Sequence, residues 1–144
     1  MSIRNMHELH HSLGFAWGAA PVVISDTTPV VSAIVDMQGQ QSVEFVILTG
    51  TLADADATFT VLVEHGEASN LSDAAAAPDE VLLGTEAEAS FTFAADNTVK
   101  TIGYSPEKGA GKRYVRCTVT PAANTGAAPL AIAIVKLPKQ VPVA

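Results

Sequence analysis

The feature that most constrains the fold is the two-residue alternation of side-chain character in several short segments. The clearest is Lys112–Thr120, in which one face would carry Arg113, Val115, Cys117 and Val119. A period of two is the signature of a β-strand in a sheet. A second strand-like segment, Lys100–Ser105, precedes it, and the loop between them contains Pro106, Gly109 and Gly111. We therefore predict a hairpin in which Tyr104 and Tyr114 lie on paired strands and at least one of them is buried.

Similar short segments recur along the chain at intervals of about ten residues, as in sandwiches and barrels. They are Pro21–Ile24, Pro29–Val35, Ser42–Thr49, Ala57–His65, Val81–Leu83, Ala87–Ala94 and Pro129–Leu137. Their alternation favours antiparallel strands with one solvated face over the continuous apolar runs of a parallel sheet. We expect an all-β, antiparallel β-sandwich of jelly-roll-like form. One short helix is expected at Asn70–Ala77, where a capping residue precedes an alanine run.

The 144 residues fit one domain. We expect residues 21–144 to form the sandwich, with an extended C-terminal tail, because the β pattern begins at Pro21. Met1–Ala20 lacks a strand period and is interrupted by glycine, which predicts an extended N-terminal arm. Exposure of its large apolar residues to water would be unfavourable, so we expect them to bind a neighbouring copy or the surface of a larger assembly. These candidate interface residues are Met6, Leu9, Leu13, Phe15 and Trp17.

Charge is divided unevenly along the chain, whose formal net charge is −7. Residues 5–99 contain fourteen Asp and Glu but no Lys or Arg, whereas residues 100–144 contain seven basic residues and one acid, Glu107. Either strands from the two parts neutralise each other within one fold, or an acidic face of one copy meets a basic face of the next. We expect Arg113 or Arg116 to pair with an acid from the earlier part. With Lys112, these arginines complete the candidate interface residues.

The same totals exclude several protein classes. A net negative charge argues against direct nucleic-acid binding, which usually needs a basic surface. No apolar run reaches the roughly 18 residues of a membrane helix, and no secretory signal opens the chain. The single cysteine, Cys117, excludes an intrachain disulfide framework, and its phase with Val115 and Val119 predicts a buried packing role.

The sharpest chemical motif is the segment 7–11, which reads H-E-L-H-H and matches the H-E-x-x-H pattern of zinc proteases. On a helix, His7 and His11 would face one metal ion, and Glu8 would activate its water. Only six residues precede the motif, Trp17 occupies the place of a further histidine ligand, and no third ligand follows. A zinc protease and adventitious metal binding therefore rank below a flexible or interface segment.

Other chemical patterns are weaker. Asp54 and Asp56 resemble part of a calcium loop but lack its regular ligands and closing glutamate. The segment 109–112 contains a Gly-Lys pair, but Arg113 follows where a phosphate loop requires Ser or Thr. The Ser, His and Asp residues form no arrangement that suggests a nucleophile. We expect no catalytic residue, no metal and no cofactor.

A resemblance narrows the function. The chain carries Gly50 after an apolar strand, Leu71-Ser-Asp73 before an alanine run, Leu83-Gly84, Ile102-Gly-Tyr104 and Lys112-Arg-Tyr-Val-Arg116. This order resembles a group of small tailed-bacteriophage proteins encoded beside the major capsid protein, which act as head decoration or accessory virion proteins. The likeness covers roughly residues 30–138, and it rests on ordinary rather than catalytic residues.

The resemblance implies a non-enzymatic decoration (cement) protein that stabilises the head shell. It further implies a location on the capsid exterior after assembly in the host cytoplasm, the major capsid protein as partner, and a homo-oligomer, either a trimer or a dimer. A virion-associated binding module that contacts the tail, the host surface or carbohydrate remains the alternative. Sugar sites usually present exposed aromatic residues with polar neighbours. Trp17, Tyr104 and Tyr114 are the only Trp and Tyr residues, and this scarcity favours the cement protein.

Overall fold

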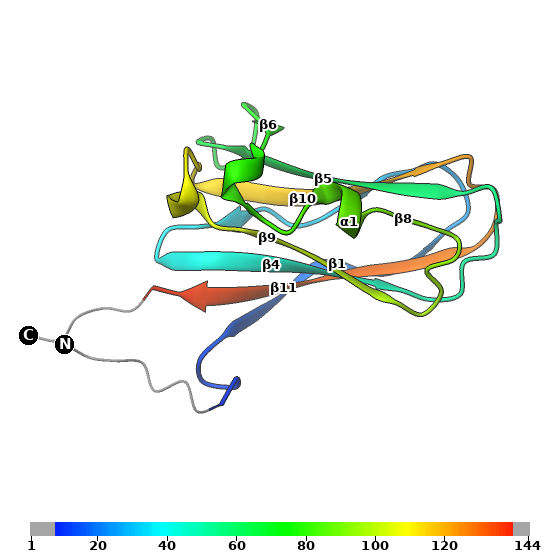
Figure 1. Cartoon of the computed structure of the whole chain (residues 1–144), viewed down its shortest axis with the longest axis horizontal. Helices are drawn as coiled ribbons and strands as arrows, with labels where there is room; N and C mark the ends of the chain where they lie inside the picture. Colours follow the sequence, from blue (N-terminus) through cyan, green and yellow to red (C-terminus); the bar gives the residue numbers. More distant parts are fainter. Residues whose placement is uncertain (1–7, 140–144) are drawn as a thin grey trace, which may run out of the picture.

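The computed structural model describes residues 8–139, which form two antiparallel β-sheets packed face to face (Figure 1). The elements are β1 (Gly14–Ile24), β2 (Val30–Val31), β3 (Val35–Asp36), β4 (Gln40–Thr49), β5 (Thr58–Gly66), β6 (Ala75–Ala76), β7 (Leu82–Leu83), α1 (Glu86–Ala89), β8 (Phe91–Thr92), β9 (Val99–Tyr104), β10 (Tyr114–Ala122) and β11 (Ala128–Pro138). Two short 3-10 turns span Asp79–Val81 and Pro106–Lys108. The predicted β-sandwich with one short helix is confirmed.

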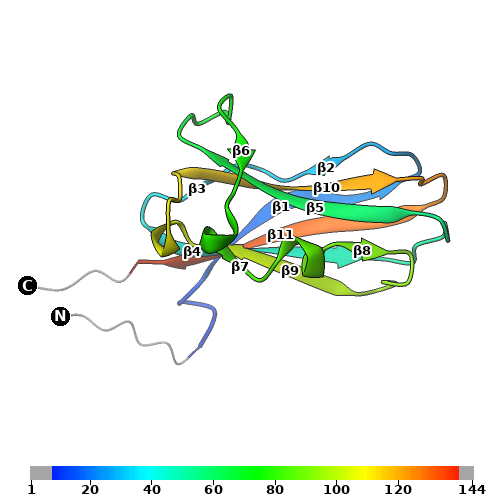
Figure 2. The same ribbon diagram turned by 45° about the horizontal axis from the view of Figure 1, so that its top comes forward.

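The first sheet, here called sheet A, has the strand order β1-β11-β4-β9-β7. The second, sheet B, has the order β2-β10-β5-β6, with β3 also paired to β10 and β8 to β5. In sheet A the last strand of the chain, β11, lies between β1 and β4 and pairs with both along most of its length (Figure 2). Strands from the two ends of the chain are therefore neighbours.

The core fills the space between the sheets with side chains from alternate strand positions. Sheet A contributes Val43, Phe45, Ile47, Ile102, Tyr104, Leu130, Ile132 and Ile134, and sheet B contributes Phe59, Val61, Val63, Val115, Cys117 and Val119. Cys117 is fully buried, as predicted, and burial raises the pKa of its thiol to about 12. This alternation is the pattern that the sequence shows in the four long strands β4, β5, β10 and β11.

The short helix α1 covers part of one edge of sheet B. The Ser90 hydroxyl accepts a hydrogen bond from the backbone N–H of Val61 at 2.9 Å, and a Glu86 carboxylate oxygen accepts from the N–H of Val63 at 2.7 Å. These side chains satisfy backbone donors that β5 would otherwise present to solvent between its short pairings with β8 and β6. Edge pairing at this point is therefore blocked.

The helix predicted at Asn70–Ala77 is wrong. This segment is a loop in which Leu71 adopts the left-handed conformation (φ 53°) and is buried, and Ala75–Ala76 form β6. The Asp73 carboxylate accepts hydrogen bonds from the N–H groups of Glu67 and Ala68, so it closes the loop rather than starting a helix. The helix lies instead at Glu86–Ala89, and it overlaps the start of the segment 87–94 predicted as a strand. Thr85 caps it by accepting from the N–H of Glu88.

The predicted hairpin is also wrong. β9 belongs to sheet A and β10 to sheet B, so the loop 105–113 crosses from one sheet to the other, and Tyr104 and Tyr114 are not cross-strand partners. The local sequence pattern identifies both strands but cannot say which strands pair. The prediction that one tyrosine is buried is confirmed, since Tyr104 is fully buried.

The boundary predicted for the N-terminal arm is wrong as well. Residues 14–20 belong to β1, and Gly14–Trp17 pair in regular register with residues 133–136 of β11. Register shifts follow, between Trp17 and Ala19 and between Ala19 and Val22. These irregularities and the glycines hide the strand period in the sequence. Among residues 8–139 no helix is long and apolar enough to cross a membrane.

Candidate interaction surface

The most unusual part of the described chain is β1, an edge strand that is apolar yet exposed. It contains eleven residues, none of them charged, and only Ile24 is buried. Phe15 is 62% exposed and Trp17 is 68% exposed. Their partners across β11 are Val135 and Ala133, so both aromatic side chains lie on the outer face of sheet A. Exposed aromatic side chains next to one another on an uncharged strand are typical of a binding surface.

The outer face of sheet A continues this apolar surface from strand to strand. Register places Val135 beside Glu44 and Ala133 beside Val46 on β4. The next partners along the sheet are Leu48 with Ala131 and Leu48 with Val99 of β9. We call this surface the A face; it comprises Phe15, Trp17, Val23, Glu44, Val46, Leu48, Val99, Thr101, Ala131, Ala133 and Val135.

Glu44 is the one charged side chain in the A face as defined. It is part-buried, and this burial raises the pKa of its carboxyl. The side chain lies over Gly103, where an added Cβ would come within 2.7 Å of its Oε1. A glycine at that position therefore leaves the room that the carboxylate occupies on the sheet.

A shallow apolar depression lies at one end of the A face. Its volume is about 370 Å³. It is lined by Pro21, Val22, Val23, Leu48, Thr49, Gly50, Pro129, Leu130 and Ala131. An added Cβ on Gly50 would come within 2.8 Å of Pro129, so the strands approach closely here. The depression suits an apolar side chain better than a polar ligand.

The outer face of sheet B has a different chemistry. Outward positions of β5 carry Thr58, Thr60, Leu62 and Glu64, and those of β10 carry Arg116, Thr118 and Thr120. Mixed polar and charged residues are the usual covering of a solvated sheet. The two faces of the sandwich therefore differ, and the A face is the stronger candidate for contact with another protein.

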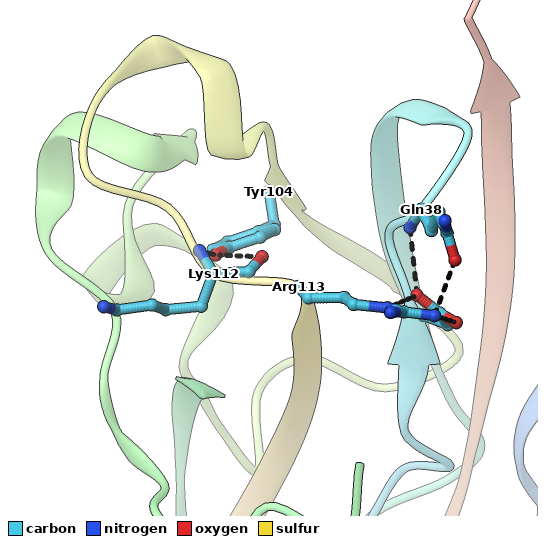
Figure 3. A network of polar contacts seen from close by, with 5 residues as sticks. Gln38, Tyr104, Lys112 and Arg113 are labelled. Atoms are coloured by element: carbon cyan, nitrogen blue, oxygen red, sulfur yellow. Dashed lines mark hydrogen bonds and ion pairs between the residues drawn. The ribbon is translucent and has the colours of Figure 1, made fainter. Parts of the chain in front are cut away.

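The candidate interface cations lie elsewhere and are used within the chain. The Arg113 guanidinium donates two hydrogen bonds of 2.9 Å to Asp36 and one of 2.6 Å to Gln38 (Figure 3). This guanidinium lowers the pKa of the Asp36 carboxyl. Arg116 pairs with Glu64 at 3.2 Å. The prediction that an arginine pairs with an earlier acid is confirmed, and the uneven charge is at least partly neutralised inside one fold.

The sequence therefore groups two sets of candidate residues that the structure separates. Leu9, Leu13, Phe15 and Trp17 lie in or next to β1, whereas Lys112 and Arg113 lie on the loop before β10, and Arg116 on β10 itself. Figure 3 shows the Lys112 and Arg113 side chains pointing in opposite directions. Met6 and His7 lie outside the described residues.

A buried polar contact holds the two sheets together beside this loop. The Tyr104 hydroxyl lies 2.8 Å from His65 Nδ1. It also accepts from the Lys112 N–H at 2.6 Å and lies 3.2 Å from the Lys112 carbonyl oxygen (Figure 3). Tyr104 belongs to sheet A and His65 to sheet B. Burial, followed by the nearby charge of Lys112, lowers the pKa of His65, which favours the neutral form of its ring in this contact.

The segments that resemble metal sites in the sequence have ordinary surroundings where they are described. His11 Nδ1 lies 2.6 Å from a Glu8 carboxylate oxygen in an exposed turn. Asp54 accepts hydrogen bonds from the backbone and hydroxyl of Thr125. Within residues 8–139 no group of three His, Cys, Asp or Glu side chains is arranged to hold a metal ion.

The chain matches no known family model, and no curated protein is significantly similar to it. Sequence reasoning identified the aromatic residues of β1 but missed the rest of the A face. A signal was present, because Ser42–Thr49 carries Val46 and Leu48 on the face opposite to Phe45 and Ile47. Apolar residues on the second face of an antiparallel strand, where polar residues are usual, favour a contact there.

Proposed function

We propose that this protein is a non-enzymatic structural component of a tailed-phage particle that binds the capsid exterior and stabilises the head shell. The observation that carries a binding role is the A face, an apolar sheet surface on a strongly acidic protein. The resemblance at residues 102–116 supports the choice of a phage head as the site of binding. On this proposal the major capsid protein is the partner, and the protein joins the shell in the host cytoplasm.

The physics of a shell suits this surface. A decoration protein binds many equivalent sites, so a modest affinity for each site is sufficient when contacts are shared. An uncharged face also avoids the cost of removing charges from water, which would weaken an interface built on unpaired carboxylates. In the A face that cost falls on Glu44 alone, and the raised pKa of its carboxyl lowers the cost of neutralising it.

A carbohydrate-binding module is less well supported. Sugar sites combine an aromatic platform with polar groups that bind hydroxyls. Phe15 and Trp17 supply a platform, but their cross-strand neighbours are Val135 and Ala133. The surroundings favour contact with another apolar surface.

Two leucines allow a matched test of the proposed surface. Leu48 lies on the A face and is 41% exposed, whereas Leu62 lies on the outer face of sheet B and is 37% exposed. Purified full-length protein, Leu48→Lys and Leu62→Lys would each be added to heads that lack the protein, and the bound fraction would be measured after sedimentation. We expect Leu48→Lys to reduce occupancy at least about tenfold, equivalent to roughly 1.4 kcal/mol. Leu62→Lys should bind as the unmodified protein does.

The stabilising role has its own assay. Heads with and without bound protein would be heated or osmotically shocked, and DNA release would be measured. We expect later release from decorated heads. Equal release from both would refute the cement role and leave an accessory virion protein, while equal occupancy by Leu48→Lys and Leu62→Lys would refute the assignment of the A face.

A further inference from the structure

The inference concerns the free edge of β1. β1 is the terminal strand of sheet A, so its second edge has no strand partner among the described residues. At Gly18 this edge is already used, because the Gly18 carbonyl oxygen accepts a hydrogen bond of 2.8 Å from the Ala33 N–H. The stretch that remains open is Gly14–Trp17, which is also the part of β1 in regular register with β11.

This open stretch has none of the features that usually keep edge strands from pairing. Such edges are normally short, bulged, or protected by charged residues or proline. The bulges of β1 begin only after Trp17, and its proline, Pro21, lies beyond them. The edge of sheet B at β5 is covered by Glu86 and Ser90, whereas no comparable side-chain contact covers Gly14–Trp17 in the described chain.

The order of side chains around Phe15 is self-complementary. Residues 13–17 read Leu-Gly-Phe-Ala-Trp, so large and small residues alternate symmetrically about Phe15. In antiparallel pairing with a second copy about a two-fold axis, Phe15 would face Phe15, Gly14 would face Ala16, and Leu13 would face Trp17. Every large side chain would then lie on the same face, as two-fold pairing of one strand with itself requires.

The distribution of charge also favours a second copy of the chain as the partner. No Asp, Glu, Lys or Arg occurs between Glu8 and Asp26, nor between Arg116 and Lys136, so β1 and most of β11 lack these charged residues. Two copies, each with a net charge of −7, repel one another over most of their surfaces. At this edge they meet without like charges in contact, which fits a second copy better than a basic partner.

Edge pairing buries the two backbones and the sides of Phe15 and Trp17 that face across the two-fold axis, while the outer surfaces of these side chains stay exposed in the joined A faces. Cross-strand contacts between such side chains contribute roughly 0.2–1 kcal/mol each. The buried area is therefore smaller than the roughly 1,000 Å² expected of a tight complex, and we expect a weak dimer. Leu9, which is 67% exposed beside the start of β1, adds apolar area next to the pairing.

We infer that two copies associate through antiparallel pairing of β1 with its counterpart, centred on Phe15, so that sheet A continues from one copy into the other. The paired sheets join their two A faces into one larger apolar surface. This inference does not depend on the phage assignment, because the dimer forms in solution.

The test uses the symmetry of position 15. Phe15→Lys and Phe15→Glu each place like charges opposite one another, and we expect each to raise the dissociation constant of the dimer at least about tenfold. Mixing the two variants places lysine opposite glutamate and should restore a mixed dimer. Val99→Lys is the control, since Val99 is 56% exposed on β9, at a distance of three strands from β1, and should leave dimerisation unchanged. Analytical ultracentrifugation measures all four.

A cross-link checks the register. Phe15→Cys should form a disulfide-linked dimer under mild oxidation, and Val99→Cys should not; the native Cys117 is buried and does not interfere. A protein that is monomeric at high concentration, or a dimer that survives Phe15→Lys and fails to cross-link through position 15, would overturn the inference. Neither result would affect the capsid-binding assay with Leu48→Lys, so failure of this inference is distinguishable from failure of the proposed function.

Discussion

Replacing Tyr104 with phenylalanine tests the contact that links the two sheets. The substitution keeps the buried ring and removes only the hydroxyl, which contacts His65 Nδ1 at 2.8 Å and the Lys112 N–H at 2.6 Å. Only a single oxygen atom is lost, so the substitution creates no sizeable cavity. The change in the free energy of unfolding therefore reports the hydrogen bonds and not the packing.

The expected change in the free energy of unfolding depends on which buried polar groups lose a hydrogen-bond partner. A buried polar atom left without a hydrogen bond costs about 1–3 kcal/mol. His65 is only 5% exposed, so its Nδ1 bears that cost, and the Lys112 N–H loses its 2.6 Å partner as well. We expect Tyr104→Phe to lower the free energy of unfolding by about 2 kcal/mol, which moves the urea midpoint down by roughly 1 M if the slope is about 2 kcal/mol/M.

Tyr114→Phe is the matched control. Tyr114 is half-buried, its hydroxyl makes no hydrogen bond within residues 8–139, and its ring keeps the contact with the Arg113 guanidinium. We expect a change below about 0.5 kcal/mol. Urea unfolding followed by fluorescence measures both variants. A Tyr104→Phe protein as stable as Tyr114→Phe would refute the reasoning, because the buried contact would then contribute nothing.

Two further predictions concern pH and the N-terminal strand. The pKa of His65 is lowered below its ordinary value of 6.5 in a setting that includes Tyr104, Lys112, Glu67 and Asp73. As pH falls, the histidine of the unfolded chain therefore binds a proton at a higher pH than that of the folded protein. The free energy of unfolding should fall as pH decreases from about 6.5. Urea midpoints measured between pH 7.5 and about 5 would show this slope, and His65→Gln should flatten it; an equal slope in that variant would contradict the assignment to His65. Deleting residues 1–20 should lower the free energy of unfolding by about 2 kcal/mol or more, since β11 loses the backbone partners supplied by Gly14–Ala19. A melting temperature that is unchanged by the deletion would show that this part of β1 adds no stability.

The long strands could be predicted because their alternation coincides with burial. In β4, β5, β10 and β11, every second residue faces the core, and a period of two in the sequence follows directly. Pairing could not be predicted in the same way. β9 and β10 are consecutive and both have strand-like sequences, yet a nine-residue connection carries the chain from one sheet to the other. No local pattern distinguishes such a crossing from a hairpin.

The candidate surface could be predicted only in part. Phe15 and Trp17 stand out in the sequence as large apolar residues without a buried role, and the structure places both on the exposed side of an edge strand. Their strand was missed because glycines and bulges interrupt its period. The interface cations were chosen by charge alone. Charge cannot show that Arg113 and Arg116 already pair with carboxylates that lie much earlier in the sequence.

The position of β11 between β1 and β4 has a consequence for synthesis of the protein. β1 and β4 are synthesised before β11, the last strand of the chain. Sheet A cannot form completely until β11 is available to pair with both of them. Until then Phe45 and Ile47 lack the strand that will lie beside them, and Gly14–Trp17 lack the strand with which they pair. Premature termination anywhere before Ala128 therefore yields a chain that cannot close its sandwich, and such fragments are suited to proteolysis or aggregation. Sheet A is continuous from β1 to β9 only in chains that include β11.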